Sequence, residues 1–127
     1  MDAKEFIHLR RILNKTQKQI AQLLGTSIKA IHSYEQGWRA IPGHAERQLL
    51  YLLAKKMGLR QKCWTIRRCP SQRRKHCPAY EFNAGEVCWF INGTICDCRE
   101  QNTWKNKIAI CRRCAAFEQL LNKIGED

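Results

Sequence analysis

Eight cysteines supply the most reactive side chains of this sequence, and the first 62 residues contain none of them. Thiolates bind zinc or iron–sulfur clusters, pair as disulfides, or act as redox-active nucleophiles, so their spacing and surroundings decide between these chemistries. The eight are Cys63, Cys69, Cys77, Cys88, Cys96, Cys98, Cys111 and Cys114.

The N-terminal segment bears on the redox state of these thiols. Residues 1–13 read MDAKEFIHLRRIL, with charges at both ends of a short apolar run and no small-residue cleavage site. This pattern is typical of an amphipathic helix and not of a secretory signal. No apolar stretch approaches the roughly 18 residues needed to span a bilayer. We therefore expect a cytoplasmic protein without a membrane partner, in which clustered thiols bind metal.

The spacing of the cysteines leaves three kinds of centre open. Only Cys111 and Cys114 have the two-residue separation of a zinc knuckle. The wider steps between residues 63 and 77 favour an iron–sulfur cluster held by thiolates from loops. Zinc and a dithiol/disulfide switch remain alternatives. We expect the ligands to be Cys69, Cys77, Cys111 and Cys114, with Cys63, Cys88, Cys96 and Cys98 as other candidates.

The charge of the chain points to a polyanionic partner. The formal net charge is +12. Residues 1–60 contain 11 Lys/Arg against 4 Asp/Glu, a net of +7, and residues 61–127 contain 12 against 7, a net of +5. Nucleic acid is the commonest partner of so basic a small protein, although a basic surface also serves solubility.

Four helices are predicted in the first 60 residues from apolar spacing and capping residues. The first carries Phe6, Leu9 and Leu13, and Asn14-Lys15 interrupts it. A second is expected at 17–24 behind Thr16 and a third at 28–36 behind Thr26 or Ser27. Glycines at 25 and 37 end these two helices, and a fourth is expected at about 44–56.

Two short helices joined by a glycine turn have the geometry that fills a DNA major groove. The stretch LRRILNKTQKQIAQLLGTSIKAIHSYEQGWRAIP resembles the Cro/CI-type (XRE-type) helix-turn-helix family over nearly all of residues 5–55. The resemblance implies that Gln17 and Arg39 contact the DNA backbone and that Arg10 pairs with Glu35 to join the first and third helices. The residues that it places at base edges are Ser27, Ile28, Lys29, His32 and Ser33.

The second part of the chain carries a different resemblance. The segments CWTIRRCP, CPAY, VCWFINGTIC and CRRCAAF resemble the two-CW cysteine-rich domain of bacterial proteins over about residues 63–117. Its recurrent cysteines correspond to all of the eight except Cys98. Prolines and glycines predict a loop-rich, metal-stapled region that ends in a helix at about 115–124. Trp64 and Trp89 follow two of the cysteines and are expected to shield the centre or to pack in a core.

The sequence as a whole predicts a mainly α protein. Residues 1–60 would form a four- to five-helix helix-turn-helix bundle that binds double-stranded DNA, and residues 61–127 a cysteine-rich iron–sulfur or zinc domain. We expect a homodimeric transcriptional regulator that senses redox, oxygen or metal state. A DNA-tethered adaptor with structural zinc that recruits a protein partner is the alternative. No catalytic constellation, HExxH motif or glycine-rich phosphate loop is present, so an enzyme is not expected.

Overall fold

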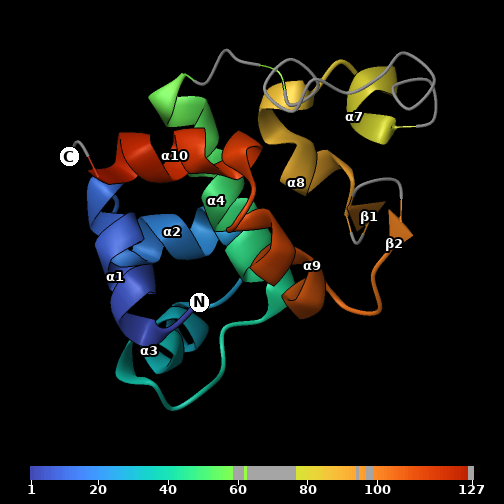
Figure 1. Cartoon of the computed structure of the whole chain (residues 1–127). Coiled ribbons are helices and arrows are strands. Elements are labelled where there is room, and N and C mark those ends of the chain that lie inside the picture. Colours follow the sequence, from blue (N-terminus) through green and yellow to red (C-terminus); the bar gives the residue numbers. More distant parts are fainter. Residues whose placement is uncertain (59–61, 63–76, 94, 97–98, 126–127) are drawn as a thin grey trace. The chain divides into compact units, whose positions relative to one another are not determined.

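The computed structural model describes residues 1–58, 62, 77–93, 95–96 and 99–125 (Figure 1). The described chain is mainly helical, which confirms the predicted fold class at this coarse level. It divides into two compact units, Met1–Lys56 and the following residues from Met57 to Glu126. Each unit is described below by itself.

Four helices make up the first unit, and they lie within two or three residues of the ranges that apolar spacing predicts. They are α1 (Ala3–Ile12), α2 (Gln17–Leu24), α3 (Ile28–Gln36) and α4 (Gly43–Met57). Helix α3 packs against both α1 and α2. Because α2 and α3 are separated by only three residues, their relative direction is set by the turn between them.

Short polar side chains and glycines define the ends of these helices. The Thr16 hydroxyl accepts a hydrogen bond from the Gln19 backbone N–H, and the Gln19 side chain accepts one from the Thr16 N–H, which completes a capping box. Ser27 caps α3 through the Ala30 N–H. At the other ends, Gly25 and Gly37 have φ of 68° and 78°, a left-handed conformation that glycine adopts without a Cβ clash.

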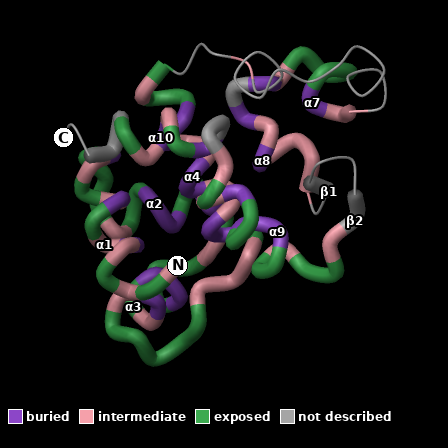
Figure 2. Tube along the Cα trace, in the orientation of Figure 1, coloured by how far each residue is buried: buried purple, intermediate pink, exposed green. Residues whose placement is uncertain are grey.

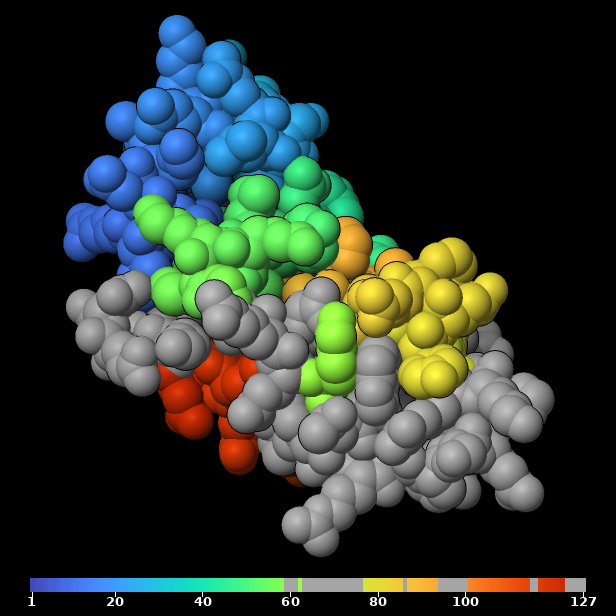
Figure 3. Space-filling model, turned by 90° about the horizontal axis from the view of Figure 1, so that it is seen from above, coloured from blue at the N-terminus to red at the C-terminus, as the bar shows by residue number. Residues whose placement is uncertain are grey.

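The core of the first unit is formed by the inward faces of all four helices. Figure 2 shows buried segments on each helix alternating with exposed ones, as expected of amphipathic helices. Phe6 of α1 and Tyr34 of α3 meet edge to face, with ring centroids 6.0 Å apart. In the space-filling view, atoms of the first helices (blue) adjoin those of α4 (green) (Figure 3). The apolar side chains with the least exposure are Phe6, Ile20, Ile31, Leu49, Leu50 and Leu53.

Helix α4 also donates hydrogen bonds to the C-terminal ends of two other helices. Lys56 Nζ lies 2.9 Å from the Leu13 carbonyl oxygen and 3.3 Å from that of Ile12. Gln48 Nε2 donates to the Leu23 carbonyl oxygen at 2.7 Å. The last carbonyls of a helix have no partner within it, and the positive Lys56 also complements the negative end of the α1 dipole.

The second unit contains short helical segments, a small hairpin and two longer helices. Its elements are α7 (Pro78–Glu81), η1 (Gly85–Val87), α8 (Cys88–Ile91), β1 (Ile95–Cys96), β2 (Arg99–Glu100), α9 (Trp104–Cys111) and α10 (Ala115–Gly125). The two strands are antiparallel, with Ile95 opposite Glu100. The predicted final helix at 115–124 is confirmed.

The prediction that this region is loop-rich up to its final helix was wrong for residues 104–111. Thr103 caps α9 by accepting a hydrogen bond from the Asn106 N–H. Apolar periodicity does not predict this helix because its buried positions include a charged residue, Lys107, beside Ile108 and Cys111. A lysine in the sequence normally indicates a solvent-facing position, so the apolar stripe was not visible.

Aromatic side chains and that lysine form the core of the second unit. Trp89 and Phe117 are almost fully buried and meet edge to face at 5.6 Å. Lys107 is equally buried, donates a hydrogen bond from Nζ to the Trp89 carbonyl oxygen, and lies 5.1 Å from the centre of the Trp104 ring. A backbone acceptor and an aromatic face offset part of the cost of burying an ammonium group.

None of the helices in the described part of the chain is long and apolar enough to cross a membrane.

The capping box at Thr16 gives a direct test of how α2 begins. Thr16→Ala removes the acceptor for the Gln19 N–H and should lower the free energy of unfolding by about 1 kcal/mol in urea denaturation. Thr26→Ala is the matched control, because Thr26 precedes the residue that caps α3 and only its backbone N–H, which bonds to the Ala21 oxygen, is engaged. Equal losses in the two variants would contradict the assignment.

Candidate nucleic-acid interface and cysteine cluster

Helix α3 has one face in the core and one face in solvent. Ala30, Ile31 and Tyr34 are buried against the neighbouring helices. Lys29 and His32 are exposed, and so is Ile28, with 49 % of its surface accessible. An isoleucine, a lysine and a histidine in consecutive turns offer apolar, cationic and neutral polar contacts on one surface. This is the mixture that base edges in the major groove can engage.

Two of the residues predicted at base edges have a more structural position. Ser27 is the exposed N-cap of α3, and its hydroxyl oxygen accepts a hydrogen bond from the Ala30 N–H at 3.1 Å, which holds the side chain at the helix end and leaves its O–H and one lone pair for other contacts. Ser33 is half-buried, and its carbonyl oxygen accepts from the backbone N–H groups of Trp38 and Arg39. The exposed side chains of α3 therefore offer more contact surface than the two serines.

The residues predicted to hold the DNA backbone lie at the first turn of α2 and after α3. Gln17 is the first residue of α2 and is half-buried. Arg39 follows the α3 C-cap and is exposed. Among the residues that the structure describes, neither Lys29 nor Arg39 takes part in an ion pair. Both cations are therefore available to a phosphate or to a base.

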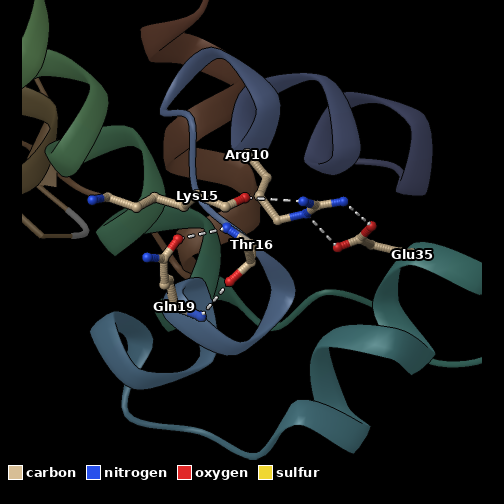
Figure 4. Close-up of polar contacts among 5 residues, drawn as sticks. All are labelled: Arg10, Lys15, Thr16, Gln19 and Glu35. Carbon is tan, nitrogen blue, oxygen red and sulfur yellow. Dashed lines mark hydrogen bonds and ion pairs between the residues drawn. The ribbon is translucent and has the colours of Figure 1, made fainter.

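A bidentate ion pair ties α1 to α3 (Figure 4). Arg10 Nε donates to Glu35 Oε2 at 2.8 Å, and Arg10 Nη2 donates to Oε1 at 2.9 Å. A third donor of the same guanidinium, Nη1, reaches the Lys15 carbonyl oxygen at 3.0 Å. The side chains are only 15 % and 5 % exposed, so the pair is partly protected from water. The structure thus contains the contact between the first and third helices that the sequence resemblance implies.

Sequence reasoning did not assign a role to Trp38, which lies next to the predicted contact residues. Its ring is 73 % exposed and meets the His32 ring edge to face, with centroids 5.4 Å apart and planes at 79°. The signal available in the sequence was a large aromatic residue between Gly37 and Arg39, in a segment otherwise composed of polar and small residues.

Three cysteines gather around one small residue in the second unit. Cys77, Cys88 and Cys114 pack against Ala79, which is completely buried. Asn92 Nδ2 lies 3.6 Å from Cys77 Sγ, within range of an N–H···S hydrogen bond. Helix ends position these thiols, since Cys77 precedes α7, Cys88 begins α8 and Cys114 precedes α10.

The predicted ligand set is only partly visible. Of the four cysteines proposed as ligands, Cys77, Cys111 and Cys114 are described, and Cys69 lies outside the described residues, as do Cys63 and Cys98. Cys111 is buried at the end of α9, whereas Cys88, one of the other candidates, belongs to the group around Ala79. Within the part of the chain that is described, no set of three or more His, Cys, Asp or Glu side chains is arranged to hold a metal ion. The described thiols alone do not make a metal site.

No protein-family model, curated protein or solved structure matches this chain.

The Arg10–Glu35 pair should behave as one unit in unfolding experiments. Glu35→Gln or Arg10→Ala leaves the other member without its ionic partner in a partly buried place and should cost about 3 kcal/mol in urea denaturation. In a double-mutant cycle, the loss in Arg10→Ala/Glu35→Gln should be smaller than the sum of the two single losses by about 1 kcal/mol or more.

Glu118→Gln is the control for loss of a single negative charge, because Glu118 is exposed on α10. Its free energy of unfolding should change by less than about 0.5 kcal/mol. Additive losses at Arg10 and Glu35, or an equal loss at Glu118, would show that the pair does not hold α1 and α3 together.

Proposed function

We propose that this protein is a sequence-specific, DNA-binding transcriptional regulator. Helices α2 and α3 form its helix-turn-helix motif, and α3 is the recognition helix. The observation that carries this proposal is the division of α3 into a face buried by Ala30, Ile31 and Tyr34 and an exposed face with Ile28, Lys29 and His32. The exposed face presents a cation and an apolar side chain at adjacent positions, which a DNA groove can contact together.

Ile28 and Lys29 lie in the first turn of α3, the part of a recognition helix that contacts bases, and His32 follows one turn later. Lys29 can donate to O6 or N7 of guanine, and Ile28 can contact the methyl group of thymine. Gln17 and Arg39 are positioned on either side of α3 in the sequence to hold phosphates. The N-terminus of α2 adds its own backbone N–H groups and positive dipole end there.

The charge distribution supports a polyanionic partner. Between residues 24 and 45 the only acidic residue is Glu35, and its carboxylate is taken up by Arg10. The outer surface of α3 and the loop after it therefore expose Lys29 and Arg39 in a stretch of sequence with no other carboxylate. Phosphate groups every few ångströms along a duplex complement such a surface. We further propose a homodimer, since two half-sites about one helical turn apart need two recognition helices.

The cysteine-rich unit is proposed to hold an iron–sulfur cluster through Cys77, Cys111 and Cys114, completed by Cys69 outside the described residues. The clustering of Cys77 with Cys114 and the N–H donor that Asn92 offers to Cys77 support this assignment. Cys88 is an alternative ligand on the same geometric ground. A bound cluster would supply a redox-sensitive charge, and zinc in the same place would supply only a structural link.

Lys29 and Arg39 should separate base recognition from backbone binding. We expect Lys29→Ala/Ser33→Ala to reduce discrimination between a duplex selected by the wild-type protein from a random pool and an unrelated duplex. Arg39→Ala should weaken binding to both duplexes alike and lower the slope of log K against log salt by about 1. Fluorescence anisotropy at several salt concentrations measures both effects.

Lys105→Ala serves as the charge control for Arg39→Ala, because Lys105 is exposed on α9 in the second unit. If Lys29→Ala/Ser33→Ala kept full discrimination between the two duplexes, α3 would not be the recognition helix.

The nature of the metal centre can be measured on protein purified without oxygen. We expect stoichiometric iron and acid-labile sulfide with absorbance near 400 nm, and their loss in Cys77→Ser/Cys114→Ser. Cys98→Ser is the comparison variant. Cys98 is among the other candidate ligands but lies outside the recurrent cysteines of the two-CW resemblance, so we expect this variant to keep its metal. Colourless protein with stoichiometric zinc would show a structural zinc site and contradict the iron–sulfur cluster. Metal-free protein would contradict both assignments.

A further inference from the structure

We propose that Trp38 is a DNA-contacting residue that packs on the sugar–phosphate backbone at the edge of the major groove, with His32 as its positioning residue. The indole ring would cover a deoxyribose, and its Nε1–H would donate to a phosphate oxygen. This inference rests on the proposed function and extends it to a residue outside the base-reading part of α3.

The exposure of Trp38 is the first observation behind this inference. At 73 % it has the highest exposure among the large apolar side chains that the structure describes. A single exposed apolar residue is ordinary, but tryptophan is the costliest side chain to leave in water and is enriched at interfaces. Among the described residues, no acceptor is found for its indole N–H. The side chain therefore has both an apolar surface and a hydrogen-bond donor to offer.

The second observation is that this exposed ring is held in place. Gly37 turns the chain with φ of 78°, and the Trp38 backbone N–H then donates to the Ser33 carbonyl oxygen at 3.0 Å, as in a Schellman helix end. The edge-to-face contact with His32, at 5.4 Å and 79°, places the ring beside a residue of the exposed face of α3 and favours this orientation. A side chain that is already ordered loses little conformational entropy on binding.

The neighbouring charges identify the class of partner. Arg39 follows Trp38 in the sequence. Lys29 lies one turn before His32 on α3, and His32 supports the Trp38 ring. Glu35, the one carboxylate in this stretch, is held by Arg10. An apolar protein surface would have to desolvate Lys29 and Arg39 to cover the indole. A phosphodiester backbone instead pairs with both cations while its sugars meet the ring.

Substitutions at Trp38 test the contact. With a duplex selected by the wild-type protein, Trp38→Ala should weaken binding about tenfold, a loss that corresponds to one hydrogen bond to a charged group plus ring packing. Trp38→Phe should recover part of the loss, because the ring remains but the N–H donor is gone. The salt slope should stay unchanged in both variants, since no positive charge is removed, in contrast to Arg39→Ala.

Two further variants separate positioning from contact. His32→Ala should weaken binding less than Trp38→Ala, and the loss in the combined variant should be smaller than the sum of the two single losses, because part of the His32 contribution acts through the ring. Phe82→Ala is the matched control, since Phe82 is an aromatic residue of the second unit with 62 % exposure. Its affinity should equal that of the wild type. Unfolding free energies should be unchanged by Trp38→Ala, so misfolding can be recognised.

The possible results distinguish this inference from the proposed function. Wild-type affinity for the selected duplex in Trp38→Ala, or an equal loss in Phe82→Ala, would overturn the role of Trp38 and leave the helix-turn-helix proposal standing. Trp38→Ala could also become monomeric while each recognition helix keeps its DNA affinity. That result would assign the ring to a contact between copies of this chain. Failure of the wild-type protein to bind any duplex would overturn both proposals.

Discussion

The Arg10–Glu35 ion pair is the contact on which the orientation of α3 depends. Helix α3 has only nine residues, and its buried side chains are an alanine, an isoleucine and a tyrosine. Apolar contacts of this size permit small rotations about the helix axis. A bidentate guanidinium–carboxylate pair does not, because two parallel hydrogen bonds fix both distance and direction. The third hydrogen bond of Arg10, to the Lys15 carbonyl oxygen, adds the α1–α2 turn to the same support.

The support from the Arg10–Glu35 pair determines which side chains α3 presents to solvent. With Glu35 fixed toward α1 and Tyr34 in the core, the exposed positions of α3 are Ile28, Lys29, His32 and Gln36. The left-handed glycines at 25 and 37 bring the chain into and out of the helix without adding side chains to that surface. The ion pair, the core and the two turns together account for one polar and cationic face, which is the feature that the functional proposal uses.

Much of the first unit follows from its sequence. Leu24-Gly25 and Gln36-Gly37 mark helix ends, and Thr16 marks a beginning, because each of these residue types has a strong local preference. Sequence patterns left Thr26 and Ser27 as alternative caps of α3, and the structure assigns the cap to Ser27. The choice depends on where the turn places one hydroxyl, which local preference does not determine. The role of Trp38 was not foreseen either, since the His32 contact links residues across a helix end.

The second unit was less predictable for a physical reason. Its core uses a buried lysine beside two tryptophans, an arrangement that has no apolar periodicity to detect. Cys88 joins Cys77 and Cys114 only because α7, α8 and the residue before α10 meet at Ala79, and spacing along the chain does not show this. Cysteine spacing favoured Cys111 and Cys114 as neighbours in a site, whereas geometry also brings in a cysteine from α8.

The central claim is that α3 reads a DNA duplex from the major groove. Methylation interference on a duplex selected by the wild-type protein tests it most directly, because dimethyl sulfate modifies guanine N7 in the major groove and adenine N3 in the minor groove. The account predicts two clusters of guanines about one helical turn apart whose N7 methylation prevents binding, and loss of that effect at one guanine per half-site in Lys29→Ala. Binding that tolerates N7 methylation at every guanine but is blocked at adenine N3 would contradict it.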